Sequence, residues 1–462
     1  MASASITAVA NEHDQIPLVK GVPILGCLPE FAKDPLAFFR DLATQHEDIV
    51  EFRFGTMDIA LVTSASLSHQ ILVKEVKNFR KADREINILS AFIGNGLVTN
   101  NDTNDHKKQR KLVQPGFHFR KIQGYAQTMI DYTDRYLADW ENAQRRDISD
   151  DMFRLTMYIV SKTLFNTDME QLENNADTVG DAIGQIQRIA DQRFNQLFQI
   201  PKWIPTPNNL REKKINASLR TMIRDMIQAR TRADGSFEDG DDLMAMLLNA
   251  RYEDGSAMSE QQIMDELITL FIAGHETTSN SLTWTLYLLS QHRDIQTRLQ
   301  AELDEVMAGE SPTFEDLEKL TYTEMVIKEA MRMFPPAWTL SARQSNSDIV
   351  IDGYFIPKDK TLFISPYANH YNPRYFNEPD RFDPERFTPE REKSLPRFAY
   401  MPFGAGPRVC IGNSFAMMEA KLILATLVKR FNFELCPDQA IQPQPQITLS
   451  NEGGMHMQIT AR

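Results

Sequence analysis

Residues 402–412 read Pro402-Phe403-Gly404-Ala405-Gly406-Pro407-Arg408-Val409-Cys410-Ile411-Gly412. The three glycines and two prolines of this stretch predict a tight loop rather than a helix or a strand. A helical pattern begins directly after it, at Asn413. Backbone N–H groups of such a loop and the positive end of the helix dipole stabilise a thiolate, which makes Cys410 a candidate metal ligand. The alternative is that Cys410 is a small buried hydrophobe.

The pattern Phe403-x-x-Gly406-x-Arg408-x-Cys410-x-Gly412 resembles the haem-binding signature of the cytochrome P450 monooxygenases. The resemblance implies a mainly α-helical fold with a small β-rich lobe. It also implies haem b (iron protoporphyrin IX) as the cofactor, with Cys410 as the iron ligand and with Phe403 and Arg408 in contact with the haem. A thiolate ligand in an apolar pocket pushes electron density onto haem iron and favours O–O cleavage.

Composition and length are those of a large globular protein. The 462 residues are 42% hydrophobic and 24% charged. Length alone predicts about three domains, but no Gly/Ser-rich or Pro-rich linker divides the chain, and the resemblance extends over nearly all of it. We therefore expect a flexible segment over residues 1–15 and a single haem domain over residues 16–462.

Charge and apolar patterning limit the partners and the location. A net charge of −13 argues against nucleic acid as a partner. Residues 1–15 carry no signal-peptide pattern, and no uncharged apolar stretch reaches about 18 residues, so we expect no transmembrane anchor. Cys27, Cys410 and Cys436 have neither disulfide nor metal-site spacing, which favours a reducing compartment. We expect a soluble, cytoplasmic enzyme of bacterial type.

Hydrophobic periodicity and turn residues predict the remaining elements. They are an extended surface stretch at 16–31, a helix near 35–45, a hairpin of 49–54 with 59–62, largely helical structure over 122–250 broken by loops at 199–207 and 231–242, a hairpin at 349–356, a last helix from 413 to about 431, and strands ending near 458–460. The family resemblance implies that the 122–250 region covers the substrate channel.

His106 and Arg110 lie four residues apart on a predicted helix and therefore share a face. The resemblance implies that both hold a haem propionate, together with Arg408 and with Arg343 from the segment before the 349–356 hairpin. A solvated basic helix is the alternative. The other basic residues of this helix are Lys107, Lys108 and Lys111. These three lysines form either a docking face for an acidic electron carrier or a merely solvated surface.

The longest predicted helix starts at the capping box Ser259-Glu260-Gln261-Gln262 and continues to about His292. Its middle reads Ala273-Gly274-His275-Glu276-Thr277-Thr278 and resembles the oxygen-activation motif of the family. We interpret Glu276 and Thr277 as the acid–alcohol pair that delivers protons to the oxygen, Gly274 as the residue that leaves room for O2, and Ala273 as a contact of cofactor and substrate. A Thr hydroxyl bonded back to its own helix is the alternative.

Glu329 and Arg332 lie at positions i and i+3 of another predicted helix, which in isolation is an ordinary surface ion pair. Phe382-Asp383-Pro384-Glu385-Arg386-Phe387 supplies a further arginine, Arg386. The resemblance implies that Glu329, Arg332 and Arg386 form a buried charge network that fixes the loop behind the haem. We expect the loss of any member to abolish haem incorporation.

The flanking sequence most resembles the haem domain of the fatty-acid-hydroxylating flavocytochrome group. Where that relative binds the substrate carboxylate at the channel mouth with an Arg and a Tyr, this chain has Met57 and Leu61. Where it packs a phenylalanine over the haem, this chain has Val98, which leaves room for a bulkier substrate. The predicted substrate pocket consists of Val98, Ala273, Ala337 and Ile447. Plain core packing is the alternative for each of them.

We therefore expect a haem-thiolate monooxygenase that uses O2 and two electrons to hydroxylate a lipophilic substrate, whether a steroid, a terpenoid, a macrocycle or a fatty acid. No flavin, nicotinamide or iron–sulfur domain fits after Cys410, which implies a separate ferredoxin or flavodoxin with its reductase. Two alternatives are a peroxide-driven haem enzyme, against which the pair of Glu276 and Thr277 counts, and a non-catalytic haem-binding sensor.

Overall fold

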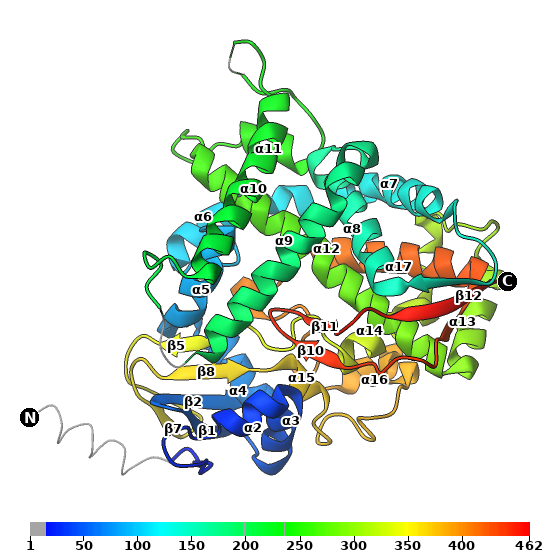
Figure 1. Ribbon diagram of the computed structural model, residues 1–462. Coiled ribbons are helices and arrows are strands. Elements are labelled where there is room, and N and C mark those ends of the chain that lie inside the picture. The colour runs from blue at the N-terminus through cyan, green and yellow to red at the C-terminus, as the bar shows by residue number, and fades with distance from the viewer. Residues whose placement is uncertain (1–14, 197–199, 235) are drawn as a thin grey trace, which may run out of the picture.

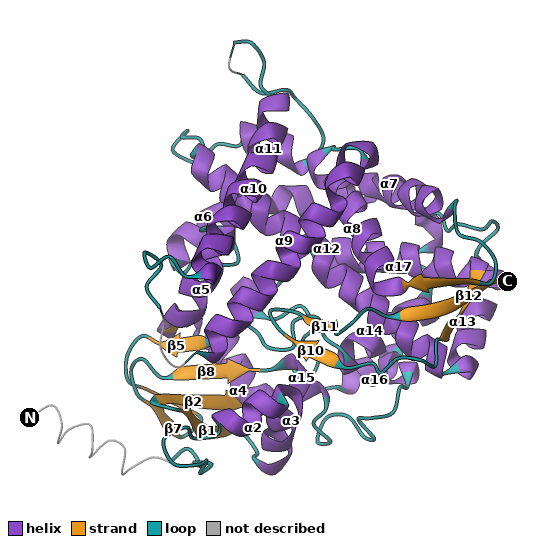
Figure 2. Cartoon of the chain, viewed as in Figure 1, coloured by secondary structure: helices purple, strands orange, loops and turns teal. Residues whose placement is uncertain are grey.

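The computed structural model describes residues 15–196, 200–234 and 236–462. Helices make up most of it; the largest sheet lies at the lower left of the view and a smaller one, with β12, at the right near the C-terminus (Figure 2). The predicted fold class, mainly α with a β-rich lobe, is therefore confirmed. Nearly all of the predicted flexible segment, residues 1–15, lies outside the described residues. None of the helices in the described parts combines the length and the apolar character that crossing a bilayer requires.

The β-rich lobe is a five-stranded sheet in the order β1-β2-β8-β5-β3 (Figure 1). Its strands are β1 Ile49–Phe54, β2 Met57–Val62, β3 Phe79–Lys81, β5 Arg343–Ser345 and β8 Thr361–Ile364. The β1–β2 hairpin was predicted, and it turns at Gly55, whose φ of +60° suits glycine. The smaller sheets are β4 Gln144–Asp147 with β12 His456–Ala461 and β9 Phe431–Leu435, β6 Ile349–Ile351 with β7 Tyr354–Ile356, and β10 Pro443–Pro445 with β11 Leu449–Asn451.

The α-helices surround one long central helix, α12 (Figure 1). They are α2 Leu28–Lys33, α3 Pro35–Gln45, α4 Ala65–His69, α5 Asp83–Ile93, α6 Thr103–Val113, α7 Phe119–Leu137, α8 Ile148–Phe165, α9 Met169–Asn195, α10 Pro207–Ala229, α11 Leu243–Asn249, α12 Glu260–Gln291, α13 Arg293–Val306, α14 Thr321–Met333, α15 Pro366–His370, α16 Pro389–Ser394 and α17 Asn413–Arg430. Two details differ from expectation: α2 begins inside the stretch predicted to be extended, and β4 interrupts the region predicted to be helical.

Helix α12 was predicted to within about one residue at each end. Its N-cap Ser259 accepts a hydrogen bond from the backbone N–H of Gln262 at 3.2 Å. The reciprocal half of the predicted capping box is absent, because the Gln262 side chain accepts a bond from Tyr252 Oη at 2.9 Å instead. Side chains all around α12 are buried, as expected for a helix in the centre of a large core. One of them, Trp284, stacks on Phe334 with ring centroids 4.1 Å apart.

Helices α5, α9 and α10 pack on one another through a smaller apolar cluster, which we call the lid cluster. Its buried members are Ile88, Phe92, Ala182, Ile186, Ile189, Ala190, Ile215 and Leu219. It shares no buried side chain with the core around α12, which receives Ile183 from α9 and Ile223 from α10. A buried ion pair between Arg193 and Glu212 joins α9 to α10. The loop predicted between these two helices is present over residues 200–206.

Candidate active site

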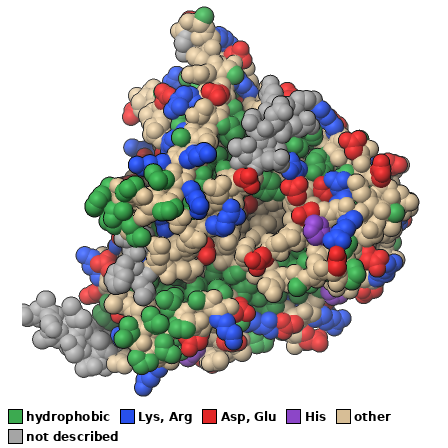
Figure 3. All heavy atoms as spheres, viewed as in Figure 1, with side chains coloured by type: hydrophobic (Ala, Val, Ile, Leu, Met, Phe, Trp, Pro, Cys, Tyr) green, Lys and Arg blue, Asp and Glu red, His purple; other side chains and the backbone are tan. Residues whose placement is uncertain are grey.

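A cavity of about 1450 Å³ lies between α12, α5, α9, the β-rich lobe and the 402–412 loop. Ligand pockets of small molecules usually measure about 300–1,000 Å³, so this one has room for more than one ligand. Cys410 lies on one side of it and the middle of α12 on another. Several large hydrophobic side chains are exposed in the two chain segments that include the lining residues Leu28 and Ile200: Ile24, Leu25, Ile200 and Trp203. Figure 3 shows hydrophobic side chains gathered in patches on one face of the molecule.

The Cys410 loop depends on its glycines. Gly404 and Gly406 adopt φ values of +71° and +68°, which side-chain-bearing residues rarely adopt. A Cβ on Gly406 would also lie 2.1 Å from the carbonyl oxygen of Leu72. The backbone N–H of Cys410 donates to the carbonyl oxygen of Phe403 at 2.9 Å, which closes the loop. These constraints direct the Cys410 side chain into the cavity, directly before the start of α17.

The electrostatics of Cys410 differ from the sequence expectation. Burial raises the pKa of its thiol, whereas the backbone N–H of Gly412 and the charge of Arg110 lower it and are outweighed. The backbone N–H groups of the loop therefore stabilise the thiolate form of Cys410, but not enough to offset the effect of burial. A metal cation at this position would supply the missing charge, because thiolate binding to a metal releases the proton.

Among the basic side chains that line the cavity, five influence one another's charge: Lys81, His106, Arg110, Arg343 and Arg408. Four of them donate to backbone carbonyl oxygens rather than to carboxylates. Arg110 Nη1 bonds to Val409 and Arg408 Nη1 to Asn100, both at 2.8 Å, while Arg343 bonds to Ser341 and Lys81 to Val98. None of the four forms an ion pair among the described residues.

This group carries excess positive charge. Burial, with repulsion from neighbouring cations, lowers the pKa of Lys81 to about 7, of His106 to about 3 and of Arg408 to about 10. Glu85 is the carboxylate that offsets Lys81 and Arg343. Buried cations without enough anions are costly, so this wall of the cavity suits a ligand with carboxylate groups. The two propionates of haem, which the sequence resemblance implies, fit that requirement.

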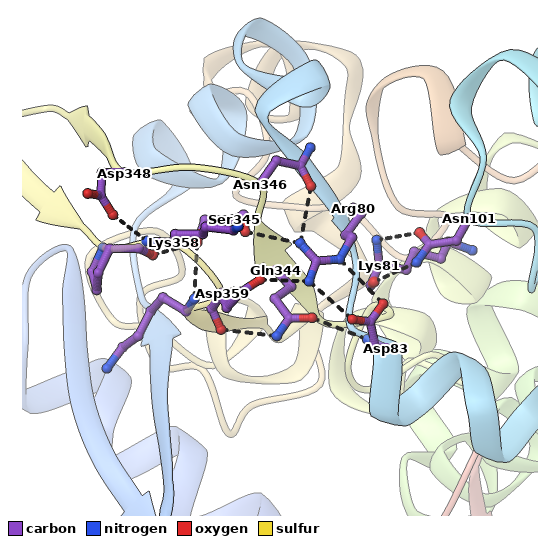
Figure 4. Close-up of polar contacts among 12 residues, drawn as sticks. Arg80, Lys81, Asp83, Asn101, Gln344, Ser345, Asn346, Asp348, Lys358 and Asp359 are labelled. Carbon is purple, nitrogen blue, oxygen red and sulfur yellow. Dashed lines mark hydrogen bonds and ion pairs between the residues drawn. The ribbon is translucent and has the colours of Figure 1, made fainter.

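Lys81 was not identified from the sequence, and Figure 4 shows how it is placed. Asn101 holds its backbone twice, donating to the carbonyl oxygen at 2.9 Å and accepting from the N–H at 2.8 Å. The preceding residue, Arg80, pairs with Asp83 and Asp359. Because successive side chains of a strand point to opposite faces, Lys81 is directed to the cavity while Arg80 is not.

Strand pairing sets Lys81 directly opposite Arg343 on β3 and β5. Like charges at directly opposed positions destabilise a sheet. An anion bound between them at the cavity wall would offset this repulsion. A lysine at the end of a short strand carries no distinguishing pattern, so only the β3–β5 register could have pointed to this residue.

Thr277 and Gly274 of α12 both line the cavity, as does Ala273. Thr277 Oγ1 donates to the carbonyl oxygen of Ala273 at 2.9 Å, which is the back-bonded geometry considered from the sequence. A Cβ on Gly274 would lie 3.2 Å from Val160 Cγ2 of α8. The missing side chain therefore permits close helix packing, and the predicted role of Gly274 in admitting O2 stays a prediction.

Glu276, also on the cavity wall, is buried, and no cation pairs with it in the part of the chain that the structure describes. Its Oε1 accepts hydrogen bonds from Gln187 Nε2 and from Thr448 Oγ1. Burial raises the pKa of Glu276 to about 7, although the Thr448 bond opposes the shift. No hydrogen bond joins Glu276 to Thr277 among the described residues. Neither Gln187 nor Thr448 was identified from the sequence, because both lie far from the α12 motif along the chain.

The predicted substrate residues meet at the cavity, which is lined by Val98, Ala273, Ala337 and Ile447. Their contact with substrate stays a prediction. Met57 also lines the cavity. The expectation that Leu61 lies at the channel mouth was wrong. It is fully buried in the core with Phe39, because it lies further along the same face of β2, under helix α3.

The predicted charge network lies behind the Cys410 loop. Arg332 donates to Glu329 through Nε at 2.7 Å and through Nη2 at 2.9 Å, and both side chains are fully buried. Arg386 Nε donates to Glu329 Oε1 at 3.2 Å, and the backbone N–H of Asp383 donates to the same oxygen at 2.9 Å. The three residues therefore meet as expected, and the consequence for haem incorporation stays a prediction.

His370 connects this network to the loop and was not identified from the sequence. Arg332 Nη1 donates to the His370 carbonyl oxygen at 2.9 Å. The ring of His370 accepts from the N–H of Met401 through Nε2 at 3.0 Å, so the neutral tautomer donates through Nδ1 to the Arg332 carbonyl oxygen at 3.2 Å. Met401 directly precedes the Cys410 loop, so the hydrogen bonds of His370 fix the point at which this loop begins.

Comparison with known proteins gives a consistent result. A family model described as cytochrome P450 matches residues 16–456. Cyclooctatin synthase of Streptomyces melanosporofaciens is 35% identical over 440 residues, covering 93% of this chain and 92% of that protein. Cyclooctat-9-en-7-ol 5-monooxygenase of the same organism is 34% identical over 422 residues, 90% of this chain and 89% of that protein. Pentalenene oxygenase of Streptomyces avermitilis is 32% identical over 445 residues, 96% of each chain.

Acid should destabilise the fold through His370. Burial and the charge of Arg332 lower its pKa from 6.5 to about 3. Between about pH 6.5 and pH 3 the His370 side chain is protonated in the unfolded chain but neutral in the folded chain. The folded state therefore loses stability as the pH falls from 6.5 toward 3. The expected loss from His370 between about pH 7.5 and about pH 5 is about 2 kcal/mol in the free energy of unfolding. Denaturant unfolding of His370→Gln should show a correspondingly smaller pH dependence, and an equal dependence would contradict the assignment.

Proposed function

The chain belongs to the cytochrome P450 family and is a cytochrome P450 monooxygenase, and on that premise we propose that it hydroxylates a neutral, cyclic, lipophilic substrate with Cys410 as the iron ligand. One observation carries the proposal: a single cavity has Cys410, the α12 motif and an excess of buried cations on its walls. We also propose that residues 16–462 act as one haem domain.

We propose haem b as the form of the haem cofactor. Lys81, Arg343 and Arg408 would pair with its two propionates, together with Arg110 and the neutral ring of His106. Phe403 would contact the porphyrin beside Cys410, and Ala273 would face it from α12. When bound, thiolate-ligated haem supplies the activation of O2 and the insertion of one oxygen atom into a substrate C–H bond. Glu329, Arg332 and Arg386 would act structurally, by fixing the loop that carries Cys410.

We propose that Thr277 and Glu276 deliver protons in the cavity. Thr277 Oγ1 donates to Ala273, so the hydroxyl oxygen keeps its acceptor capacity toward the cavity. Glu276 has a pKa of about 7, which lets the carboxyl both hold and release a proton near neutral pH. This acid–alcohol pair favours O2 with two electrons over peroxide as the oxidant. Gly274, whose backbone lines the cavity, would leave room for O2 between the helix and the haem.

The cavity favours a neutral substrate. Val98, Ala337 and Ile447 are small or apolar, and Met57 near the entrance cannot pair with a carboxylate. Five of the basic residues on the wall are assigned above to the propionates. Of the other three, Arg193 pairs with Glu212, and Arg84 and Lys202 donate to backbone carbonyl oxygens. The three Streptomyces relatives are named for cyclooctatin, cyclooctat-9-en-7-ol and pentalenene. We therefore propose a cyclic terpenoid of this kind as the substrate class, ahead of a long-chain fatty acid.

We propose a separate ferredoxin or flavodoxin, with its reductase, as the electron donor. The inner face of α6 reaches the cysteine loop, because Arg110 bonds to the carbonyl oxygen of Val409. Its outer face carries the exposed lysines Lys107, Lys108 and Lys111. In a chain of net charge −13, this local basic surface suits an acidic carrier and lies on the Cys410 side of the cavity.

Replacement of Thr277 by Ala should uncouple turnover. With NADPH, O2 and surrogate electron carriers, we expect NADPH oxidation to continue while product per NADPH falls at least about tenfold and hydrogen peroxide rises. Thr285→Ala is the matched control, because Thr285 makes the same back-bond on α12, to Ser281 at 2.6 Å, and does not line the cavity. Unchanged coupling in Thr277→Ala would contradict the proton-delivery role.

Substrate class should be readable from haem absorption, which shifts when a ligand excludes water from the cavity. In a panel of cyclic terpenes, steroids and long-chain fatty acids, we expect the neutral cyclic compounds to bind most tightly. Val98→Phe should weaken their binding about tenfold by filling the space beside the haem. Val350→Phe, at an exposed position on β6, is the control. A tight response to fatty acids alone would contradict the proposed substrate class.

Reversal of charge at Lys107 and Lys108 should weaken carrier binding. We expect the double variant Lys107→Glu/Lys108→Glu to raise the KM for a ferredoxin about tenfold at low salt, with a smaller difference at high salt. Binding of substrate should not change. Lys358→Glu, an exposed lysine of the β-rich lobe, is the control. Equal KM values for both variants would show that the α6 lysines form only a solvated surface.

A further inference from the structure

We propose that Gln187 and Thr448 are positioning residues that hold the Glu276 carboxyl between lid and core, so that the position of α9 decides when this carboxyl turns toward Thr277. The inference rests on the proposed proton-delivery role of Glu276 and Thr277. It goes beyond that role by making proton delivery depend on the lid that covers the substrate.

The contacts of the carboxyl come from two different parts of the chain. Gln187 lies on α9, and Thr448 lies in the turn between β10 and β11. Both donate to the same oxygen, Glu276 Oε1. The second oxygen, Oε2, has no hydrogen-bond partner among the described residues, although Glu276 lines the cavity. One oxygen is therefore fixed, and the other remains available on the cavity side.

The Thr448 side is anchored to the main core. The backbone N–H of Leu449 donates to the carbonyl oxygen of Pro336 at 2.9 Å, and Trp284 Nε1 of α12 donates to the carbonyl oxygen of Leu449 at 3.0 Å. Asn280 Nδ2, also on α12, donates to Thr448 Oγ1 at 3.2 Å. Thr448 is thus held by α12 itself and keeps its place when the lid moves.

The Gln187 side belongs to the boundary of the lid. Ile183, one turn earlier on α9, packs in the main core, whereas Ile186 and Ile189 pack in the lid cluster. A shift of the lid cluster against the core therefore moves Gln187 relative to Glu276. Such a shift breaks the hydrogen bond from Gln187. The Glu276 carboxyl then turns to the cavity side of α12, toward Thr277.

Both holding groups are neutral and can act as donor or acceptor. Gln187 Oε1 is buried without a hydrogen-bond partner among the described residues. If the Gln187 side-chain amide rotates by half a turn, this oxygen can accept a hydrogen bond from a protonated Glu276. The elements around Glu276 carry several titratable groups, among them Arg188 and Asp191 on α9, His275 on α12 and Glu419 on α17. None of them contributes to its pKa, which is set by burial and by Thr448. In the present arrangement both groups donate to the carboxyl, which favours its charged form.

Infrared difference spectroscopy of the holoenzyme tests the contact without measuring activity. The carboxyl band of Glu276 is identified as the band that is missing in Glu276→Gln. Its intensity is then followed as a function of pH to give the apparent pKa of Glu276. Gln187→Leu and Thr448→Val should each raise its apparent pKa by about one unit, because each removes a hydrogen bond to the charged form. Thr448→Ser should restore the wild-type value. Gln192→Leu is the matched control on α9, because Gln192 bonds only to Asn208 of α10 at the surface. A wild-type pKa in both Gln187→Leu and Thr448→Val would overturn the proposal.

The dependence on the lid has its own readout. Addition of the tightest-binding compound of the substrate panel should shift the Glu276 band in the wild type and in Gln192→Leu, and should leave it unshifted in Gln187→Leu. An equal shift in Gln187→Leu would overturn the lid dependence. Failure of the proposed function looks different: coupling would then survive Thr277→Ala, while the infrared band would still report the held carboxyl.

Discussion

The ion pair between Glu329 and Arg332 is the interaction on which the Cys410 loop depends. Two opposite charges at full burial are expensive to desolvate, and replacing such a pair by apolar residues is often neutral or stabilising. Stability alone therefore does not explain its presence. Its geometry does, because the remaining donors and acceptors of the pair bind backbone groups of residues 370, 381 and 383. The pair fixes the paths of separate chain segments relative to one another, and the ring of His370 extends that order to Met401 and the Cys410 loop.

A second constraint operates on the opposite side of the loop. There the protein places cations where its own carboxylates do not neutralise them, including the directly opposed Lys81 and Arg343. The sheet register and the clamp by Asn101 hold them in place against their mutual repulsion. The fold thus carries an electrostatic cost that a carboxylate-bearing cofactor relieves. Folding and cofactor binding are coupled through this cost, since a ligand that binds only the folded chain stabilises it.

Local motifs were predictable from the sequence because their residues lie close together along the chain. The glycines of the Cys410 loop, the α12 motif and the pair of Glu329 and Arg332 all belong to this kind. Lys81, His370, Gln187 and Thr448 were missed because their roles arise from strand register or from contacts between distant segments. Leu61 was misplaced for a related reason: the resemblance matched it to a position at the channel mouth, whereas packing under α3 buries it completely. The pKa of Cys410 was misjudged because burial, which outweighs the loop amides, is not visible in a local pattern.

The separation of the lid cluster from the core around α12 has an evolutionary consequence. Substitutions at sites with few shared packing partners contribute nearly additively to stability, and the two clusters share only partly buried side chains among the described residues: Ile93, Met222 and Ile272. Side chains such as Phe92, Ile186 and Leu219 can therefore vary in size with little effect on the packing behind Cys410. Selection for a new substrate can act on α5, α9 and α10 while the oxygen chemistry remains intact. Gln187 on α9 is an exception, because its replacement would remove a hydrogen bond to Glu276 and so affect the proposed proton delivery.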